Sequence, residues 1–314
     1  MIKVSAPGKI HLLGEHSIVY GKPALLATVD LRVTVILKPW TYNDTIVHMY
    51  GVVKKVKKTV EDVVKTYLKL KAIPPYNLEI SSQLPIGAGL GSSAAISSSF
   101  IAALLSLLKV KWDLNLVNSL AFEAEKEFHG NPSGADNSTI VYGGLVWYRK
   151  ETPDLKIIQK LPFSIFPKLA KNFVLINTGT PKETTKQMIT MTQALFAKRP
   201  KLKDTFLTAQ EKLVRELLPT LKDGNEKELI RIIRTGEKNL ESIDVVSSFA
   251  KNIIKKIENI GGAAKICGAG GKAGPTGILL TYHQDKNKLE EIAKSFNLPF
   301  FSTRLGVEGI RQES

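Results

Sequence analysis

Hydrophobic and polar side chains in the first third of the chain follow the periods of strands and of one helix. Residues 24–39, ALLATVDLRVTVILKP, are rich in β-branched side chains and predict a long strand. Residues 76–83, YNLEISSQ, alternate polar and apolar positions and predict a second strand. Between them, residues 59–72 have helical spacing, with Thr59 as a candidate N-cap. We therefore predict a strand-rich N-terminal region that contains a helix.

The middle of the chain combines helices with strands. Residues 94–108 predict a buried helix, and residues 114–128 predict another. Residues 144–150 and 172–179 are short apolar stretches that predict strands. The region therefore has mixed α/β character.

The hydrophobic pattern changes near residue 180. From residue 181 to residue 260 it is almost wholly helical, in about four segments. These segments are divided near Pro200, Gly224 and Asp244. The end of the chain returns to short strands and glycines, with a helix over residues 287–296. A length of 314 residues also suggests about two domains, which we place at residues 1–180 and 181–314.

Positive charge is the main compositional feature. The chain has 44 Lys and Arg against 29 Asp and Glu, a formal net charge of +15. Such a charge suits nucleic acid, an anionic membrane surface or an acidic small substrate, and it also suits simple solvated faces. The lysines are scattered and only 7% of residues are aromatic, so stacking on bases is not expected. We predict neither a nucleic-acid partner nor a membrane partner.

Cysteine content and the apolar runs predict the compartment. The single cysteine, Cys267, excludes an internal disulfide framework and fits a reducing environment. The longest apolar run, residues 100–110, is too short to span a bilayer. The first residues lack the basic and apolar pattern of a secretory signal. We therefore expect a cytoplasmic protein.

An uncharged stretch, PIGAGLGSSA at residues 85–94, is the first candidate for chemistry. It follows a predicted strand and opens a predicted helix, an arrangement that presents free backbone N–H groups to a phosphate. Its spacing matches neither a Walker A loop nor a Rossmann fingerprint, and a simple packing turn is the alternative. The residues assigned to a nucleotide are Pro85, Gly87, Gly89, Leu90, Gly91, Ser92, Ser93 and Ala94.

Four segments together resemble one family. The stretch at 85–94 resembles the second motif, Pro-x-x-x-Gly-Leu-Gly-Ser-Ser-Ala, of the GHMP small-molecule kinases. Residues 6–25, APGKIHLLGEHSIVYGKPAL, resemble the first motif, and residues 265–280, KICGAGGKAGPTGILL, the third. Within residues 125–144, HGNPSGADN is similar to a signature of the mevalonate kinases of this family. The four matches occur in the family's order and span nearly the whole chain.

This resemblance implies a fold and an activity. The fold is a two-domain kinase of GHMP type, with an α/β N-terminal domain like domain 2 of ribosomal protein S5 and a ferredoxin-like α+β C-terminal domain. The implied activity is ATP-dependent phosphorylation of the C5 hydroxyl of mevalonate in isoprenoid biosynthesis, with ATP and Mg²⁺ and a homodimeric assembly. The alternatives are a phosphomevalonate, homoserine or sugar kinase, a related ADP-forming decarboxylase, and a non-catalytic nucleotide-binding sensor.

Two residues carry the implied catalysis. The resemblance assigns Asp136 to accept the proton of the attacking hydroxyl, and its flanks, Gly134 and Asn137, predict a loop between helices. It assigns Lys9 to a position near Asp136, where an ammonium group would offset negative charge. Taken alone, an aspartate in this context is also typical of an Asx turn, and Lys9 of a surface lysine.

The resemblance also implies a metal site. Magnesium takes oxygen ligands and generally only one or two carboxylates. Glu125 occupies the family position for one ligand, and a serine of the glycine turn supplies another. We favour Ser93 over Ser92, although the sequence does not separate them.

Four residues are assigned to the acceptor substrate by the resemblance. Glu15 and His16 would bind its hydroxyls and carboxylate, with Thr184 and Gly270 nearby. Thr184 fits the start of the next helix equally well. The third motif departs from the family pattern after Gly271, because Lys272 and Pro275 interrupt it.

Overall fold

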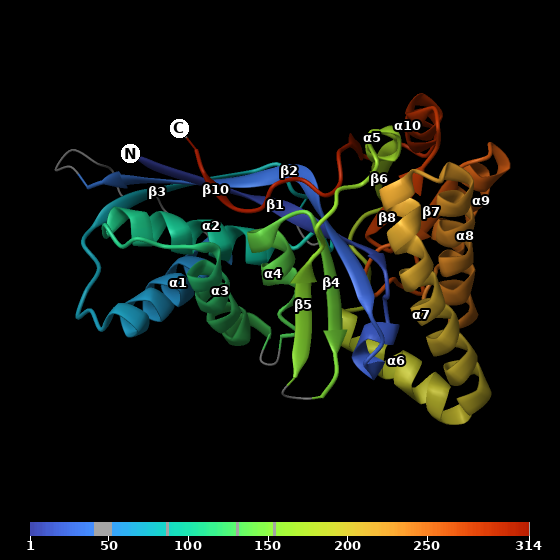
Figure 1. Cartoon of the computed structure of the whole chain (residues 1–314), viewed down its shortest axis with the longest axis horizontal. Helices are drawn as coiled ribbons and strands as arrows, with labels where there is room; N and C mark the ends of the chain where they lie inside the picture. Colours follow the sequence, from blue (N-terminus) through green and yellow to red (C-terminus); the bar gives the residue numbers. More distant parts are fainter. Residues whose placement is uncertain (41–51, 86–87, 130–131, 153–154, 314) are drawn as a thin grey trace.

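Two antiparallel sheets organise the protein (Figure 1). The structure is a computed structural model that describes residues 1–40, 52–85, 88–129, 132–152 and 155–313. The six strands of the first sheet are β1 (Ile2–Leu13), β2 (Ala24–Pro39), β3 (Tyr76–Ser82), β4 (Leu145–Lys150), β5 (Lys156–Lys160) and β10 (Arg311–Gln312). The four strands of the second are β6 (Phe173–Asn177), β7 (Ala263–Ile266), β8 (Ile278–Tyr282) and β9 (Phe300–Ser302).

The long strand predicted at 24–39 is confirmed as β2, which pairs with β1, β3 and β4. Its register with β1 shifts twice: near the middle, where Pro7 lies opposite Arg32 but Gly8 lies opposite Val29, and again between His11 and Leu13. At the first shift, the extra residues on β2 form a bulge, which changes the direction of the strand locally. The part of β1 that follows this bulge carries residues 8–13 of the first motif, including Lys9.

Two helices, α2 and α4, pack directly on the first sheet, α1 and α3 pack against α2, and α1 to α3 lie on one side of the sheet in Figure 1. These helices are α1 (Val52–Leu68), α2 (Ser92–Leu107), α3 (Leu114–His129) and α4 (Ala135–Tyr142). The predicted helices at 94–108 and 114–128 are confirmed by α2 and α3. Helix α2 is buried along most of its length and packs directly on β1 and β2.

Helix α1 starts earlier than predicted, so the assignment of Thr59 as an N-cap is wrong. Buried Val56, Val60 and Val64 form one stripe that faces the core, and this stripe continues back through the lysine-rich segment. Lysines in that segment occupy the outer face of the same helix, where their charge is solvated. The lysine run therefore did not end the helix.

The second sheet has ferredoxin-like topology, as the resemblance implied. Its chain order is strand, helices, two strands, helix, strand, and its spatial order is β7-β8-β6-β9. The predicted helical segments are confirmed, with Pro200 opening one helix and left-handed Gly224 ending it. These segments are α6 (Thr185–Lys198), α7 (Pro200–Asp223), α8 (Glu226–Ser242) and α9 (Ser248–Asn259), and α10 (Lys286–Ser295) precedes the last strand of this sheet.

Chain segments cross between the two sheets in both directions. β6 lies before residue 180 yet belongs to the second sheet, and β10 returns from the C-terminus to pair with β1. The two chain ends therefore lie near one another in Figure 1. The domain division at residue 180 stays a prediction.

Across the described parts of the chain, no helix has the length and apolar character to cross a membrane.

Candidate active site

The glycine turn of the second motif closes on the strand of the first motif. The Lys9 N–H donates a hydrogen bond to the Leu90 carbonyl oxygen at 2.9 Å. Gly91 has a φ of +74°, and a Cβ there would lie only 2.9 Å from Lys9 Cγ and 3.1 Å from Ile140 Cδ1. Only glycine therefore permits both this backbone conformation and this approach.

The structure brings Lys9 and Asp136 together. Lys9 Nζ lies 3.0 Å from Asp136 Oδ1, with the lysine side chain 8% exposed and the aspartate side chain 41% exposed. Asp136 is in the first turn of α4, after the N-cap Gly134, so the predicted loop position is wrong. Local composition suggested a loop, but α4 begins directly after Gly134. At a helix N-terminus the carboxylate also faces the positive end of the helix dipole.

Glu125 is the third charged group of this cluster. It lies on α3 with only 4% of its surface exposed. Burial raises the pKa of its carboxyl group to about 7; the negative charge of Asp136 adds to this effect, and Lys9 opposes it. Glu125 therefore lies within electrostatic reach of both Asp136 and Lys9.

The two serines differ in their contacts. Ser92 Oγ donates a hydrogen bond to the Pro85 carbonyl oxygen at 3.4 Å, and both residues are half-buried. Ser93 is also half-buried, and its hydroxyl has no hydrogen bond within the described residues. Ser93 is therefore the freer of the two for a ligand.

The other residues assigned to the nucleotide differ in their exposure to solvent. Gly89 is exposed, with a φ of +86°. Leu90 and Ala94 are each 1% exposed, so their side chains belong to the core and only their backbone can serve a ligand. Gly87 lies outside the described residues.

Glu15 forms a buried ion pair that the sequence analysis did not predict. Its Oε1 contacts Lys265 Nζ, which also donates to the Ile266 carbonyl oxygen at 2.7 Å. Glu15 is 2% exposed and Lys265 0%. Although burial alone lowers the pKa of Lys265, the charge of Glu15 raises it overall, so the lysine stays charged. The only local signal was a lysine in the buried strand AAKI.

A second buried carboxylate completes this network. Glu237 of α8 is 1% exposed, and its Oε2 accepts a hydrogen bond from the Ile266 N–H at 2.9 Å. Burial raises the pKa of Glu237 to about 8, against the effects of this hydrogen bond and of the Lys265 charge. The network therefore ties the first motif to β7 and α8.

His16 is held inside the protein through both ring nitrogens. Nε2 lies 3.1 Å from the Ala269 carbonyl oxygen, and Nδ1 lies 3.3 Å from Thr192 Oγ1. His16 is 5% exposed, and burial lowers its pKa. Thr184, by contrast, is the exposed N-cap of α6 and forms a capping box with Gln187. The threonine that contacts His16 is Thr192, two turns later.

Gly270 allows the third motif to pack closely. Its φ is +71°, and a Cβ there would lie 2.1 Å from the Val245 carbonyl oxygen. The next residue, Gly271, donates its N–H to the same oxygen at 3.0 Å. This packing holds the Ala269 carbonyl against His16. Lys272 is exposed, beyond this contact.

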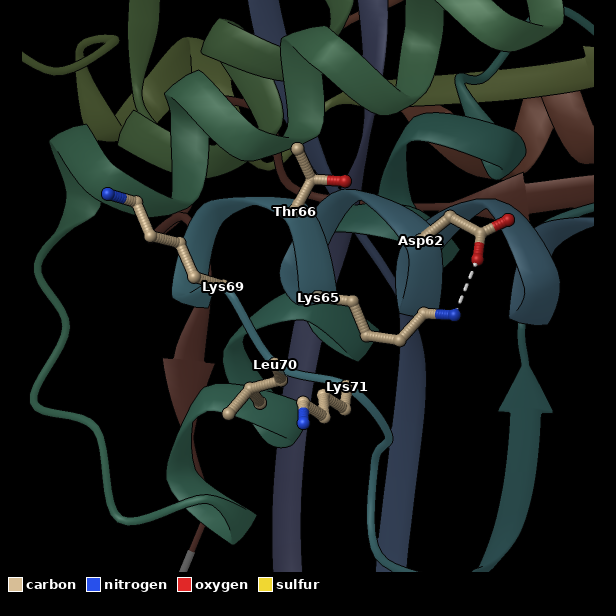
Figure 2. A pocket seen from close by; sticks show the side chains of 6 residues that line it. All are labelled: Asp62, Lys65, Thr66, Lys69, Leu70 and Lys71. Carbon is tan, nitrogen blue, oxygen red and sulfur yellow. Dashed lines mark ion pairs between the residues drawn. The ribbon is translucent and has the colours of Figure 1, made fainter.

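A surface hollow of about 410 Å³ lies elsewhere, at the C-terminal end of α1 (Figure 2). Its lysines do not converge: Lys65 pairs with Asp62 at 3.0 Å, while Lys69 and Lys71 point in other directions in Figure 2. It therefore lacks the geometry of an anion site, and the chemistry lies with Lys9 and Asp136.

Comparisons with known proteins show which sequences resemble this chain. The family described as GHMP kinases N terminal domain matches residues 51–144. A mevalonate kinase of Archaeoglobus fulgidus is 30% identical over 270 residues, covering 85% of this chain and 88% of the relative. A mevalonate kinase of Mus musculus is 26% identical, covering 99% of this chain and 95% of the relative.

Solved structures share the fold. A crystal structure of a mevalonate kinase superposes with a TM-score of 0.81 at 23% identity, covering 98% of this chain and 100% of the other. The Methanococcus jannaschii mevalonate kinase superposes with a TM-score of 0.80 at 22% identity, covering 96% and 98%. The mixed α/β architecture with two sheets is therefore the GHMP kinase fold.

Loss of the buried cation should destabilise the fold strongly. We expect Lys265→Met to lower the free energy of unfolding by about 3–5 kcal/mol, because it leaves Glu15 charged and buried. Lys38→Met is the control, since the Lys38–Glu79 pair is exposed and should contribute under about 1 kcal/mol. Urea unfolding measures both. Equal losses would contradict the importance of the buried pair, and Glu15→Gln added to Lys265→Met should recover part of the loss.

Glu237 should make stability depend on pH. The folded state holds a proton up to about pH 8, whereas the unfolded chain releases it near the ordinary value of 4.5. The stabilisation is therefore complete at low pH and is lost as the pH rises through that window, by about 1.4 kcal/mol per pH unit. Glu237→Gln, which keeps an oxygen for the Ile266 N–H, should remove this decline in urea unfolding. Identical pH profiles of the two proteins would argue against it.

Proposed function

The chain belongs to the mevalonate kinases of the GHMP kinase family, and on this premise we propose that it transfers the γ-phosphoryl group of ATP to the C5 hydroxyl of mevalonate. The product is 5-phosphomevalonate, an intermediate of isoprenoid biosynthesis. One observation carries the assignment of the chemistry: Lys9 and Asp136 are in contact at the place where the glycine turn meets the first motif.

Asp136 is suited to act as the base. The acceptor hydroxyl oxygen forms a bond to the γ-phosphorus, the bond from that phosphorus to the bridging oxygen breaks, and ADP leaves. The hydroxyl proton passes to the Asp136 carboxylate, whose partial exposure leaves it open to a substrate. Because such transition states are largely dissociative, positioning and charge contribute more than proton removal.

Lys9 stabilises the form of Asp136 that can act as the base. Its ammonium group, nearly buried and 3.0 Å from Asp136, favours the ionised carboxylate. It also offsets negative charge on the transferring phosphoryl group. The hydrogen bond from its backbone N–H to Leu90 holds it beside the phosphate turn.

The start of α2 is suited to the nucleotide phosphates. Exposed Gly89 and the N–H groups at the first turn of α2 can approach an anion without side chains in the way. We assign the phosphates to this turn, and the buried side chains of Leu90 and Ala94 hold it against the core.

Magnesium fits the oxygen donors beside this turn. The charges of Glu125 and Asp136 repel each other enough to contribute to the raised pKa of Glu125, so a cation between them and a phosphate would be favourable. We propose Glu125 and Ser93 as the protein ligands. When bound, the metal ion neutralises charge on the phosphates; Glu125 and Ser93 hold and orient it.

The acceptor side is formed by the first and third motifs. Glu15 and His16 have partners inside the protein, so we propose that they shape the pocket wall, with Gly270 allowing the third motif to close behind them. The capping contacts of Thr184 favour a structural role for that residue. Action in the cytoplasm and a homodimeric assembly stay predictions; cell fractionation and light scattering test them.

An ADP-release assay with MgATP and five acceptors tests the function. We expect turnover with mevalonate and not with phosphomevalonate, mevalonate diphosphate, homoserine or galactose. Asp136→Asn should lower kcat about 10²- to 10⁴-fold and leave ATP affinity within a few-fold. Asp113→Asn is the matched control, because Asp113 only caps α3.

The other outcomes of this assay are distinct. Turnover with a different acceptor would keep the kinase class and change the substrate. ATP binding with no turnover at all would favour the nucleotide sensor. A fully active Asp136→Asn protein would remove Asp136 from the role of base.

A second pair of variants tests the metal ligands. Glu125→Gln should raise the Mg²⁺ concentration for half-maximal activity at least about tenfold, since even outer-shell partners of a metal contribute that much. Glu123→Gln is the control, because Glu123 lies on the same helix but is exposed and pairs with Lys126. A Mg²⁺ titration of ADP release measures both, and equal Mg²⁺ requirements would rule out Glu125 as a ligand.

A further inference from the structure

His11 is a partly exposed residue in an otherwise buried part of β1. Every residue from Val4 to Leu13 is buried except His11, which is half-buried. Side chains alternate along a strand, so His11 shares a face with Lys9 and lies about 6.6 Å further along it. The imidazole is therefore on the same face of β1 as Lys9, which contacts Asp136.

Three charged groups act on His11. They are Lys9, Asp136 and Lys265, which all lie within electrostatic reach of its ring. Burial lowers its pKa to about 3, and the two lysines add to this effect while Asp136 opposes it. The ring is therefore neutral at physiological pH, with one N–H that can donate a hydrogen bond to an anion.

His11 also differs from His16 and His283 in its hydrogen bonds. Both ring nitrogens of His16 are occupied, and those of His283 contact the backbone of Asp285 and Ile260. For His11, Nδ1 is buried without a partner, and Nε2 makes no hydrogen bond to any described residue. Because Nδ1 is covered, the exposed edge of the ring is the one that carries Nε2.

We propose that His11 is a specificity-determining residue whose Nε2–H donates a hydrogen bond to the carboxylate of the acceptor substrate. This rests on the proposed function. The acceptor is a short hydroxy acid, and its hydroxyl must reach Asp136 beside Lys9. The spacing of Lys9 and His11 along β1 is of the order of a five-carbon chain, so the opposite end of the acceptor falls at His11.

This assignment gives the two histidines of the first motif different roles. His16, whose nitrogens are occupied, fixes the third motif against the first. His11, whose nitrogens are not, meets the ligand. Placing the proton on Nε2 leaves only an acceptor atom buried at Nδ1, which is tolerated better than a buried N–H without a partner.

Three variants test the proposal with steady-state kinetics and calorimetric binding of mevalonate. His11→Leu should raise KM and Kd for mevalonate about tenfold or more, as expected for a hydrogen bond to a charged group, with KM for ATP within about twofold. His11→Gln, whose amide nitrogen can reach the place of Nε2, should recover much of this loss. His283→Leu is the matched control: it should lower the melting temperature and leave KM for mevalonate unchanged.

The opposing results are equally specific. Mevalonate KM and Kd of His11→Leu within about twofold of the unaltered protein would overturn the proposal. A parallel rise in KM for ATP, or a loss that His11→Gln does not reduce, would show a structural role and overturn it as well. An unaltered protein that neither binds nor phosphorylates mevalonate would overturn the proposed function, and this assignment with it.

Discussion

The buried contact between Glu15 and Lys265 is the interaction on which the site depends. The two residues are 250 positions apart in the chain, Glu15 in the turn after β1 and Lys265 in β7, yet both are almost completely removed from water. Two charges are stable there only as a pair, because either one alone would pay a large desolvation cost. The pair therefore holds the first motif and the strand that opens the third motif in one arrangement, in which the Ala269 carbonyl oxygen reaches His16.

Close backbone approach is the second constraint, and glycine makes it possible. Gly91 lets the phosphate turn close on Lys9, and Gly270 lets the third motif pack against Val245. These contacts leave little room for side chains, so the charged groups of the site come from fixed positions on the backbone. Lys9 comes from β1, Asp136 from the first turn of α4 and Glu125 from α3. Such preorganised charge is what phosphoryl transfer requires, since its transition state needs positioning more than covalent help.

Local patterns predicted much of the fold and part of the site. The long strand β2, the buried helix α2 and the helical segments of the second half follow from periodicity and from Pro200 and Gly224, because these signals act over a few residues. The prediction that Lys9 lies near Asp136 came from a family resemblance. The start of α1 was missed because its lysines hide an apolar stripe, and the helical position of Asp136 was missed because the preceding turn dominates the local composition.

The sequence by itself determined which residue types are present at the glycine turns, at the base and at the predicted metal ligand, and it determined most element types through short-range periodicity. Only the tertiary structure decided how the polar groups are partnered. The ring nitrogens of His16 contact Ala269, 253 positions away, and Thr192. The ring of His11, five positions earlier in the first motif, has no such contact with the described residues. Hydrogen-bond saturation of a buried side chain depends on atoms brought together by the packing of two sheets, and no local pattern records those atoms.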